Sequence, residues 1–540
     1  MSWNFATVWE AVADAVPDRV ALVQGSRRHT WRDFDDRAAR LAGSLAELGL
    51  GPDAKVASYL YNSIEYLESV YATFKLQAVP VNVNYRYLEE ELAHLLENSD
   101  AEALVFHGSL GEHVVKVRDQ VPKLKAIIQV DDGTPLLDGA LRYHDLVAEQ
   151  APMERVARTG DDLYFLYTGG TTGMPKGVMW RNEDLFLTLA TAGYAIAGLT
   201  PPQSVAQAAE YAAQLAVEDR NGVHLPASPL MHGTGAMTTL SALSRGAKVV
   251  LLESRHFDAD ELWRAVERDR VESLAIVGDA FAKPMVRALD AAAARGEPYD
   301  LSSVALIISS GVMWSEPVKA ALMSYQAMLC VDTLGSSEGV GYANSVSAPG
   351  AASKTARFTI GEHAKVLTED GREVEPGSGE KGLLAVGGHI PLGYYKDAEK
   401  TAATFPVIDG VRYSIPGDWA TVDADGTINL LGRGSVSINS GGEKVYPEEV
   451  EEALKHHPAV ADALVVGVPD ERFGEAVTAL VSLHPGAEAT TDEIAGATEG
   501  HLARFKRPRH VVVVESVPRG PNGKADYKWA KATAVERVGA

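Results

Sequence analysis

Cysteine is almost missing from this chain, because its 540 residues include only one, Cys330. A single thiol excludes an intramolecular disulfide and a cysteine metal cluster, and Cys330 itself lies in an apolar run typical of a strand. The chain also lacks an apolar stretch of about 18 residues, and its first residues show no basic segment followed by an apolar core. We therefore expect a cytoplasmic protein that is neither secreted nor stably inserted in a membrane.

Positive charge is scarce as well. Lysine and arginine total 50, against 73 aspartates and glutamates, and the formal net charge is -23. Nucleic acids and anionic lipid surfaces are bound through basic faces, so we expect neither as the main partner. Hydrophobic residues at 46% and charged residues at 23% are ordinary for a globular protein, and the length allows more than one domain.

Residues 1–433 alternate helical patterns with short apolar runs. Five of these runs begin at Lys55, Ala103, Lys125, Ala247 and Val304. Such alternation is typical of β–α units, whose parallel strands are buried on both faces. The sequence therefore predicts an α/β fold with a large N-terminal domain of layered, largely parallel sheets and helices. Inside this domain, the segment 200–223 is predicted to be a surface connector.

Residues 434–540 are predicted to form a small, mobile α+β domain. Pro447 followed by glutamates indicates a helix start, because proline lacks only a donor that would be unpaired there and carboxylates suit the positive helix end. Strands are expected at 463–468, 477–483 and 510–514. Shortly before this domain, Asp425-Gly426 predicts the turn of a hairpin.

The most informative run spans residues 167–177 and follows an expected buried strand. It contains four glycines, three threonines and one lysine. Glycines let backbone N–H groups approach phosphate oxygens, hydroxyls add donors, and Lys176 supplies positive charge. The run is not a Walker loop, since the fifth residue after the first glycine is Met174 and Lys176 is followed by Gly177. The predicted phosphate-binding residues are Thr168, Gly169, Gly170, Thr171, Thr172, Gly173 and Lys176.

This run resembles, almost letter for letter, the phosphate loop of the adenylate-forming superfamily, which contains acyl-CoA synthetases, peptide-synthetase adenylation domains and firefly luciferase. Residues 332–338 resemble the family's aromatic-Gly-x-Thr-Glu segment, which implies that Glu338 holds Mg²⁺ on the nucleotide phosphates. Leu334 replaces the aromatic that stacks on adenine, and Ser337 replaces threonine while keeping a hydroxyl. The resemblance implies nucleotide contacts from Gly311, Asp332, Thr333, Leu334, Gly335 and Ser337.

Further matches follow in the family's order. Residues 413–419 and 432–433 resemble the ribose-binding Gly-Asp and the Gly-Arg before the interdomain hinge. The resemblance implies that Asp418 binds the ribose hydroxyls, with Arg433 beside it and the hinge at Ser435. A carboxylate can accept both hydroxyls at once, and such charge-assisted bonds contribute about 1.5–3 kcal/mol.

Two matches lie beyond the hinge. Residues 440–451 resemble the loop and helix that line the pantetheine tunnel, which implies CoA contacts from Ser440, Gly441 and Gly442. Residues 518–524 resemble the C-terminal loop with the adenylation lysine, here Lys524. Lys524 would bridge the substrate carboxylate and the α-phosphate, an electrostatic role that typically supplies about 2.7–4 kcal/mol.

The resemblance implies an AMP-forming ligase that uses Mg²⁺, ATP and CoA. A carboxylate attacks the α-phosphate of ATP, and the CoA thiol then displaces AMP from the acyl-adenylate. This chemistry needs no catalytic triad, so His224, His232 and His363 are not interpreted as general bases. The acyl pocket is expected to involve His232, Met237, Asp279 and Gly311.

The expected substrate is a hydrophobic carboxylic acid. The pocket candidates are mostly apolar or small, and the start of the pocket helix offers no aspartate to bind a substrate ammonium group. The residues at 169–170, 178–181 and 277–281 resemble those of actinobacterial synthetases that act on fatty acids or steroid side-chain acids.

Several alternatives stay open at this point. A carrier-protein phosphopantetheine could replace CoA as the acceptor, because the glycine-rich segment suits either thiol. A non-catalytic nucleotide-binding relative would be expected to have lost Lys524, Glu338 or Lys176, and all three are present. The choice between fatty and steroid acids, and the formation of a homodimer, are not decided by the sequence.

Overall fold

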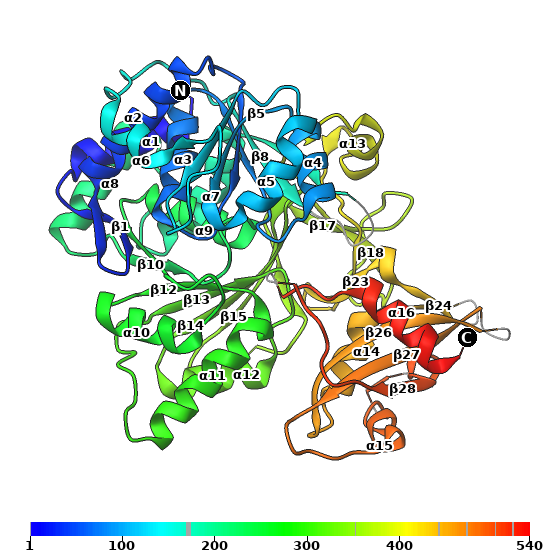
Figure 1. Ribbon diagram of the computed structural model, residues 1–540. Helices are drawn as coiled ribbons and strands as arrows, with labels where there is room; N and C mark the ends of the chain where they lie inside the picture. Colours follow the sequence, from blue (N-terminus) through cyan, green and yellow to red (C-terminus); the bar gives the residue numbers. More distant parts are fainter. Residues whose placement is uncertain are drawn as a thin grey trace. The chain divides into compact units, whose positions relative to one another are not determined.

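The computed structural model describes residues 2–168, 174–351, 353–440, 443–470, 474–499, 501–502, 504–520 and 523–539. The side chains of Arg433, Ser435, Asn439, Glu443 and Lys444 also lie outside the description. The chain divides into two compact units (Figure 1). The first unit comprises Met1–Thr355 and Gly387–Ser414, and the second comprises Ala356–Val386 and Ile415–Ala540.

One large sheet of the first unit has the strand order β15-β14-β13-β12-β10-β11-β1-β2. From β14 to β1 all neighbours are parallel, whereas β15 pairs antiparallel with β14 and β2 pairs antiparallel with β1. The strands are β1 (Val20–Gln24), β2 (Arg27–Thr30), β10 (Val223–Pro226), β11 (Lys248–Leu251), β12 (Ser273–Ile276), β13 (Leu306–Ser310), β14 (Leu329–Ser336) and β15 (Gly339–Ser347). The predicted parallel, doubly buried strands are therefore confirmed here.

Helices α10 (Ala259–Asp269), α11 (Gly278–Ala294) and α12 (Glu316–Tyr325) pack on this sheet (Figure 1). Trp263 of α10 and Phe281 of α11 belong to one buried cluster with Ile307 of β13 and Cys330 of β14. Helix α9 (Gly233–Leu243) contacts β10, β11 and β12, and α7 (Asn182–Ala195) packs on α9. The buried Cys330 lies on a strand, as predicted.

The second large sheet of this unit has the order β19-β9-β8-β4-β3-β5-β6-β7. Its strands are β3 (Lys55–Tyr59), β4 (Val79–Asn82), β5 (Ala101–His107), β6 (Ala126–Val130), β7 (Leu141–Arg142), β8 (Leu163–Thr168), β9 (Lys176–Arg181) and β19 (Gly393–Tyr394). In this order, all neighbours from β8 to β7 are parallel, whereas β9 pairs antiparallel with β8 and β19 pairs antiparallel with β9. The short hairpin β20 (Val407–Ile408) and β21 (Val411–Arg412) completes the described strands of the unit.

Helices cover both faces of the second sheet. Figure 1 shows α2 and α3 on one side of the strands and α4 and α5 on the other. Besides α7 and α9 to α12, the described helices of the first unit are α1 (Phe5–Ala15), α2 (Trp31–Glu47), α3 (Ile64–Lys75), α4 (Glu89–Asn98), α5 (Gly111–Val117), α6 (Tyr143–Glu149), α8 (Val205–Val217) and α13 (Ala398–Thr404), with 3-10 turns at Gly108–Leu110 and Arg118–Gln120. The segment 200–223 differs from the predicted connector, because α8 packs on α1 through buried Ala208, Ala212 and Leu215.

The second unit begins with antiparallel strands in the order β17-β18-β22-β23-β16. They are β16 (Arg357–Ile360), β17 (Ala364–Leu367), β18 (Lys381–Val386), β22 (Asp418–Val422) and β23 (Thr427–Arg433). The predicted turn at Asp425-Gly426 joins β22 to β23, and Gly426 has a φ of 81°. A 3-10 turn at Gly434–Val436 follows β23.

The remainder of the second unit is the predicted α+β assembly. Strand β27 (Gly474–Leu483) pairs antiparallel with β26 (Val460–Asp470) and parallel with β28 (His510–Val513), and β24 (Ile438–Ser440) and β25 (Glu443–Val445) continue the sheet. Helices α14 (Pro447–Leu454) and α15 (Thr491–Gly496) share one buried cluster with the sheet, and α16 (Tyr527–Val538) packs in another. A 3-10 turn at Arg504–Lys506 precedes β28. The helix start at Pro447 and the three predicted strands are confirmed.

The two units do not coincide with the predicted domains 1–433 and 434–540, because 356–386 and 415–433 pack with the C-terminal residues. The predicted boundary marks the place where the C-terminal residues are expected to rotate about Ser435, and this rotation stays a prediction. Among the described residues, no helix has the length and apolarity needed to cross a membrane.

Candidate active site

Several predicted site residues of the first unit follow the carboxyl ends of neighbouring parallel strands. His232 comes after β10, Asp279 after β12 and Gly311 directly after β13. In the paired strands β13 and β14, Ser309 lies opposite Asp332 and Ser310 lies opposite Thr333. Ligands of open parallel sheets bind at this edge, because loops from adjacent strands converge there. The structure thus brings the predicted acyl residues and the 332–338 segment to one end of the sheet.

The expected acyl residues belong to the starts of two helices and the loop after β13. Thr234, in the first turn of α9, donates its hydroxyl to the Ser310 carbonyl at 3.4 Å. Gly311 has a φ of 93°, a backbone conformation that favours glycine, so the chain can turn here directly at the strand end. Met237 is buried on α9, and His232 immediately precedes that helix and is half-buried.

Asp279 fastens the loop after β13 to the start of α11. Its carboxylate accepts hydrogen bonds from the Ser315 backbone N–H at 2.9 Å and from the Ser315 hydroxyl at 2.8 Å. Lys283, one turn further along α11, lies 3.6 Å from the same carboxylate. These contacts mean that Asp279 shapes the expected pocket wall through Ser315.

Two asparagines that the sequence did not single out, the buried Asn82 and the half-buried Asn62, hold the loop that leads to His232. Asn82, at the end of β4, donates to the Tyr167 and Met231 carbonyls at 2.8 and 2.6 Å and accepts from the Tyr167 N–H at 2.6 Å. Asn62 donates to the Ser228 carbonyl at 3.1 Å. Both asparagines lie next to the ends of parallel strands. This position could have identified them in the sequence, because a buried amide group needs hydrogen-bond partners.

Asp332 is buried on β14, with an exposed fraction of 5%. Burial raises the pKa of its carboxyl group to about 7, against the opposing influence of Lys319. The ammonium group of Lys319 is itself buried and donates to Ser353 at 3.0 Å. Asp332 therefore carries less negative charge near neutral pH than an exposed aspartate would.

Glu338 is held by residues from three other parts of the first unit. Its Oε1 accepts a hydrogen bond from the Tyr394 hydroxyl at 2.7 Å, and its backbone carbonyl accepts from the Ser414 hydroxyl at 2.6 Å. The Ser414 hydroxyl also lies 2.9 Å from the Tyr342 hydroxyl, and Trp180 donates to the Ser337 carbonyl at 3.0 Å. The sequence identified Glu338 but not the supporting role of these residues, because Tyr394, Ser414 and Trp180 are distant in the chain from residues 337–338.

Lys176 forms an ion pair with Asp397 at 2.6 Å. The other oxygen of Asp397 accepts from the Lys400 N–H at 2.9 Å and so caps α13. The pKa of Asp397 is lowered, chiefly by the hydrogen bond from Lys176. Tyr394 and Asp397 belong to one short segment, which pairs with β9 through β19, so this segment holds both Glu338 and Lys176.

Glu338 is suited to a hard divalent cation. Mg²⁺ is usually bound by one or two protein carboxylates together with substrate phosphates, and Glu338 is a half-buried carboxylate in the turn between β14 and β15. Within the described ranges, no group of three or more histidine, cysteine, aspartate or glutamate side chains is arranged to hold a metal ion.

In the second unit, Asp418 and Arg433 lie directly opposite each other on β22 and β23. Gly417 and Gly432, which precede them, have φ values of 105° and 116°. A side chain on Gly432 would also collide with Glu448 of α14, since its Cβ would lie 2.2 Å from a carboxylate oxygen. The backbone conformation thus explains why glycine occupies the first position of both the predicted Gly-Asp and the predicted Gly-Arg pair.

Two further predicted residues belong to the second unit. Ser440 is buried at the end of β24, and its hydroxyl has no hydrogen-bond partner in the described part of the chain. Lys524 is exposed, and it lies in a short turn closed by the bridge between Arg519 and Ala525.

Some predicted residues fall outside the description. These are Gly169, Gly170, Thr171, Thr172 and Gly173 of the phosphate loop, and Gly441 and Gly442 of the expected CoA segment. The side chains of Arg433 and Ser435 are outside it as well. Their roles stay predictions, as do the ligand contacts of the described site residues.

Two titratable groups that could suggest other chemistry are buried and neutral. Burial, aided by the charge of Arg245, lowers the pKa of His224 to about 3, and its ring nitrogens pair with Ser273 and Thr238. Burial raises the pKa of the Cys330 thiol to about 12. Neither group is prepared to act as a base or a nucleophile at neutral pH.

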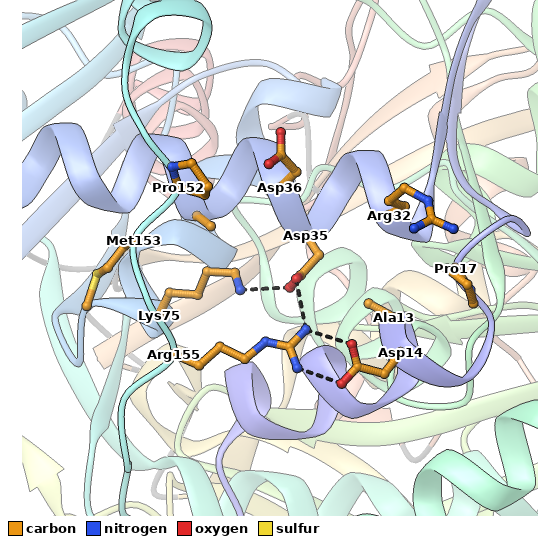
Figure 2. Close-up of a pocket in the computed structure, with 11 residues that line it drawn as sticks. Ala13, Asp14, Pro17, Arg32, Asp35, Asp36, Lys75, Pro152, Met153 and Arg155 are labelled. Carbon is orange, nitrogen blue, oxygen red and sulfur yellow. Dashed lines mark hydrogen bonds and ion pairs between the residues drawn. The ribbon is translucent and has the colours of Figure 1, made fainter.

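A separate cavity of about 340 Å³ lies beside α1 and α2 (Figure 2). Its charged lining is internally compensated: Arg155 forms ion pairs with Asp14 at 2.6 Å and with Asp35 at 3.1 Å, and Lys75 pairs with Asp35 at 2.7 Å. None of the predicted site residues lines it. We therefore interpret these charges as a structural network between α1, α2 and α3.

Comparison with known proteins agrees with this arrangement. The family model for the AMP-binding enzyme matches residues 9–395, and that for the AMP-binding enzyme C-terminal domain matches residues 449–524. The crystal structure of the anthranilate CoA ligase AuaEII in complex with anthranoyl-AMP has a TM-score of 0.86 at 22% identity and covers 100% of this chain and 99% of its own. This likeness supports the predicted fold.

Curated relatives match over nearly the full length. The chain is 43% identical to the 3-oxocholest-4-en-26-oate--CoA ligase of Rhodococcus rhodochrous, over 98% of this chain and 96% of the relative. It is also 43% identical to the medium/long-chain-fatty-acid--CoA/3-oxocholest-4-en-26-oate--CoA ligase of Mycolicibacterium smegmatis, over 99% and 97% of the two chains. These matches confirm the resemblance found in the sequence, and the chain belongs to the family of AMP-binding, adenylate-forming enzymes.

Proposed function

We propose that this protein is an ATP-dependent acyl-CoA synthetase that activates a hydrophobic carboxylic acid, either a medium- or long-chain fatty acid or a steroid side-chain acid. The observation that carries the proposal is the 43% identity, over 98% of the chain, to a CoA ligase of a steroid side-chain acid. A relative of equal identity also takes medium- and long-chain fatty acids by its name. The predicted class, an AMP-forming acid–thiol ligase, is confirmed by the family and these relatives.

In the first half-reaction, a carboxylate oxygen of the acid attacks the α-phosphorus of ATP. A new O–P bond forms, the bond to the bridging oxygen of the β-phosphate breaks, and pyrophosphate leaves. Lys176 and the 168–173 loop bind the phosphates, and Lys524 offsets the negative charge that gathers on the α-phosphate and the attacking carboxylate. Mg²⁺, held by Glu338, would neutralise phosphate charge when bound.

In the second half-reaction, the CoA thiol gives up its proton to solvent and its sulfur attacks the acyl carbon; an S–C bond forms, the acyl C–O bond to AMP breaks, and AMP leaves. Asp418 and Arg433 hold the ribose, and Ser440, Gly441 and Gly442 border the pantetheine arm. A rotation about Ser435 exchanges the two reaction states and keeps water from the reactive anhydride. The opposed positions of Asp418 and Arg433 on β22 and β23 support a shared ribose role.

The acyl end of the site favours apolar substrates. Met237 is buried on α9, and a Cβ on Gly233 would lie 3.6 Å from Leu166 and 4.0 Å from Met237. Residues 232–237 include no aspartate that could pair with a substrate ammonium group. Nucleotide contacts from Thr168, Gly311 and residues 332–337 complete the proposed site. A cytoplasmic location and a homodimer stay predictions.

The proposal is tested by mixing the purified protein with MgATP, a panel of acids and either CoA or a phosphopantetheinylated carrier protein. We expect AMP, pyrophosphate and acyl-CoA from fatty or steroid acids. Acyl transfer to the carrier protein but not to CoA would instead establish an acyl-AMP ligase. Failure to form AMP with every acid, while ATP still binds, would establish a non-catalytic relative.

A further inference from the structure

An arginine–aspartate pair lies beside the turn that carries Lys524. Arg519 Nε donates to Asp462 Oδ2 at 2.6 Å, and Arg519 Nη2 donates to Asp462 Oδ1 at 2.8 Å. The third nitrogen of the same guanidinium, Nη1, donates to the Gly523 carbonyl at 3.2 Å. A single side chain therefore links strand β26, which contains Asp462, to the residue immediately before Lys524.

The turn itself is closed by backbone hydrogen bonds. The Gly520 N–H donates to the Lys524 carbonyl at 2.8 Å, and the Gly523 N–H donates to the Gly520 carbonyl at 2.9 Å. Gly523 has a φ of 67°, which favours glycine. Because the Lys524 side chain is exposed, the direction in which it leaves the domain depends on this backbone and on whatever anchors it.

The Arg519–Asp462 pair belongs to a half-buried polar network of the second unit, in which Glu451 is buried. Burial opposes ionisation of Asp462, but hydrogen bonds from Arg519 and the charge of Lys455 lower its pKa overall. The neighbouring Glu451 accepts from the Val465 N–H and from the Tyr527 hydroxyl, each at 3.0 Å. Tyr527 begins α16 directly after the turn, so the chain is fastened on both sides of Lys524.

We propose that Arg519 and Asp462 are positioning residues for Lys524, and that their bidentate pair sets the turn from which this lysine reaches the reacting groups during adenylation. The inference rests on the proposed role of Lys524. A planar guanidinium can bind both carboxylate oxygens and the Gly523 carbonyl at once, whereas an ammonium group has no such fork. Displacements near 1 Å at a reacting group can cost about 10²-fold in rate, so a loosened turn is expected to affect kcat.

The test uses the full-length variants Arg519→Lys and Asp462→Asn. Adenylation is measured as pyrophosphate release, and thioester formation is measured separately from supplied acyl-AMP and CoA. We expect a decrease in the kcat of adenylation of about 10–100-fold, with the KM for ATP changed by less than about threefold. Thioester formation should stay near wild type. The ratio of the two rates is independent of the folded fraction, so partial unfolding cannot imitate this result.

Two comparisons sharpen the test. In a Lys524→Ala background, Arg519→Lys should cause no further loss of adenylation, since residues that act through one group are not additive. The matched control is Arg507→Lys, because Arg507 lies in the same unit and, among the described residues, its hydrogen bonds go to Glu499 at 2.6 Å and to the Leu502 carbonyl at 3.2 Å. We expect both half-reactions of this control to be unchanged.

The outcomes separate the inference from the proposed function. Equal loss of both half-reactions in Arg519→Lys, or an additional loss in the Lys524→Ala background, would show a general structural role and overturn the inference. If Lys524→Ala abolishes adenylation and Arg519→Lys does not impair it, the inference fails alone. If Lys524→Ala itself leaves adenylation intact, the proposed role of Lys524 fails and the inference fails with it.

Discussion

Glu338 in the first unit and Lys524 in the second are held in opposite ways. The Glu338 side chain is half-buried, and its carboxylate accepts a hydrogen bond directly from Tyr394. Lys524 is exposed, and the recorded hydrogen bonds of its turn involve the backbone and the Arg519 guanidinium. The side chain itself accepts a hydrogen bond in the case of Glu338, and hydrogen bonds to the backbone hold the chain around Lys524.

The difference matches the proposed tasks. A carboxylate that belongs to the nucleotide site in both reaction states benefits from a fixed orientation, because it then does not have to reorient when the ligand binds. A lysine that acts in only one of two reaction states must change its surroundings, so an exposed side chain on an anchored backbone suits it better. Lys176 is held in the same way as Glu338, through its side chain, because its ammonium group is paired with Asp397.

The largest expected effect is that of Lys524→Ala. Loss of the charge should slow acyl-AMP formation by about 10²-fold or more, while thioester formation from supplied acyl-AMP should be largely retained. Pyrophosphate release and acyl-CoA formation are the two measurements. If both fall to the same extent, Lys524 does not act in one state only, and the contrast with Glu338 disappears.

The second prediction concerns the pivot at Ser435. Ser435→Pro should hold φ near −65° and lock the C-terminal residues in one state, so that one half-reaction is lost while the other continues. Ser435→Ala is the control and should leave both half-reactions near wild type, because only the backbone needs to turn. A folded proline variant that keeps both activities, or loses both, would place the pivot elsewhere.

Tyr394→Phe tests the side-chain support of Glu338. Hydrogen bonds to charged groups contribute about 1.5–3 kcal/mol, so we expect kcat/KM for MgATP to fall about tenfold and the Mg²⁺ concentration for half-maximal rate to rise. Tyr395→Phe is the matched control, since the Tyr395 hydroxyl donates to Asp100 at 2.8 Å. The same defect in both variants would mean that Glu338 is not specifically held by Tyr394.

The acyl preference should depend on the first unit alone. Along a straight-chain acid series, affinity should improve by about 0.8 kcal/mol per methylene, roughly fourfold each, until the pocket ends. The relative chain-length profile should be the same in wild type and in Lys524→Ala. A profile that shifts in the variant, or a preference for α-amino acids, would contradict this assignment.

The smallest expected effect is on stability. Burial raises the pKa of Asp332 to about 7, above its unfolded value, so the folded protein retains a proton that the unfolded chain has lost between about pH 4 and 7. Its contribution to stability is therefore present below about pH 4 and is lost as the pH rises through about 7. Asp332→Asn should raise the melting temperature by about 1–3 °C at pH 8 and change it little near pH 4, measured by thermal unfolding.

Much of the fold was predictable because local patterns and tertiary structure agree. The runs at Lys55, Ala103 and Val304 become β3, β5 and β13, since apolar runs of this length must be buried on both faces. The segment 200–223 is the instructive exception. Its helix α8 is rich in alanine and follows two prolines, which suggested a connector, but in the structure it packs against α1 as an ordered element.

The sequence alone determined the family and the identity of the chemical groups, because motifs such as 332–338 and 518–524 keep their residue types close together in the chain. Only the tertiary structure decided what holds those groups: Tyr394 on Glu338, Asp397 on Lys176, and Asp462 through Arg519 beneath Lys524. These partners are 56, 221 and 57 positions away from the residues they contact. A hydrogen bond depends on the distance and angle between its two groups in space. Partners that are so far apart in the chain can therefore be identified only from the folded structure.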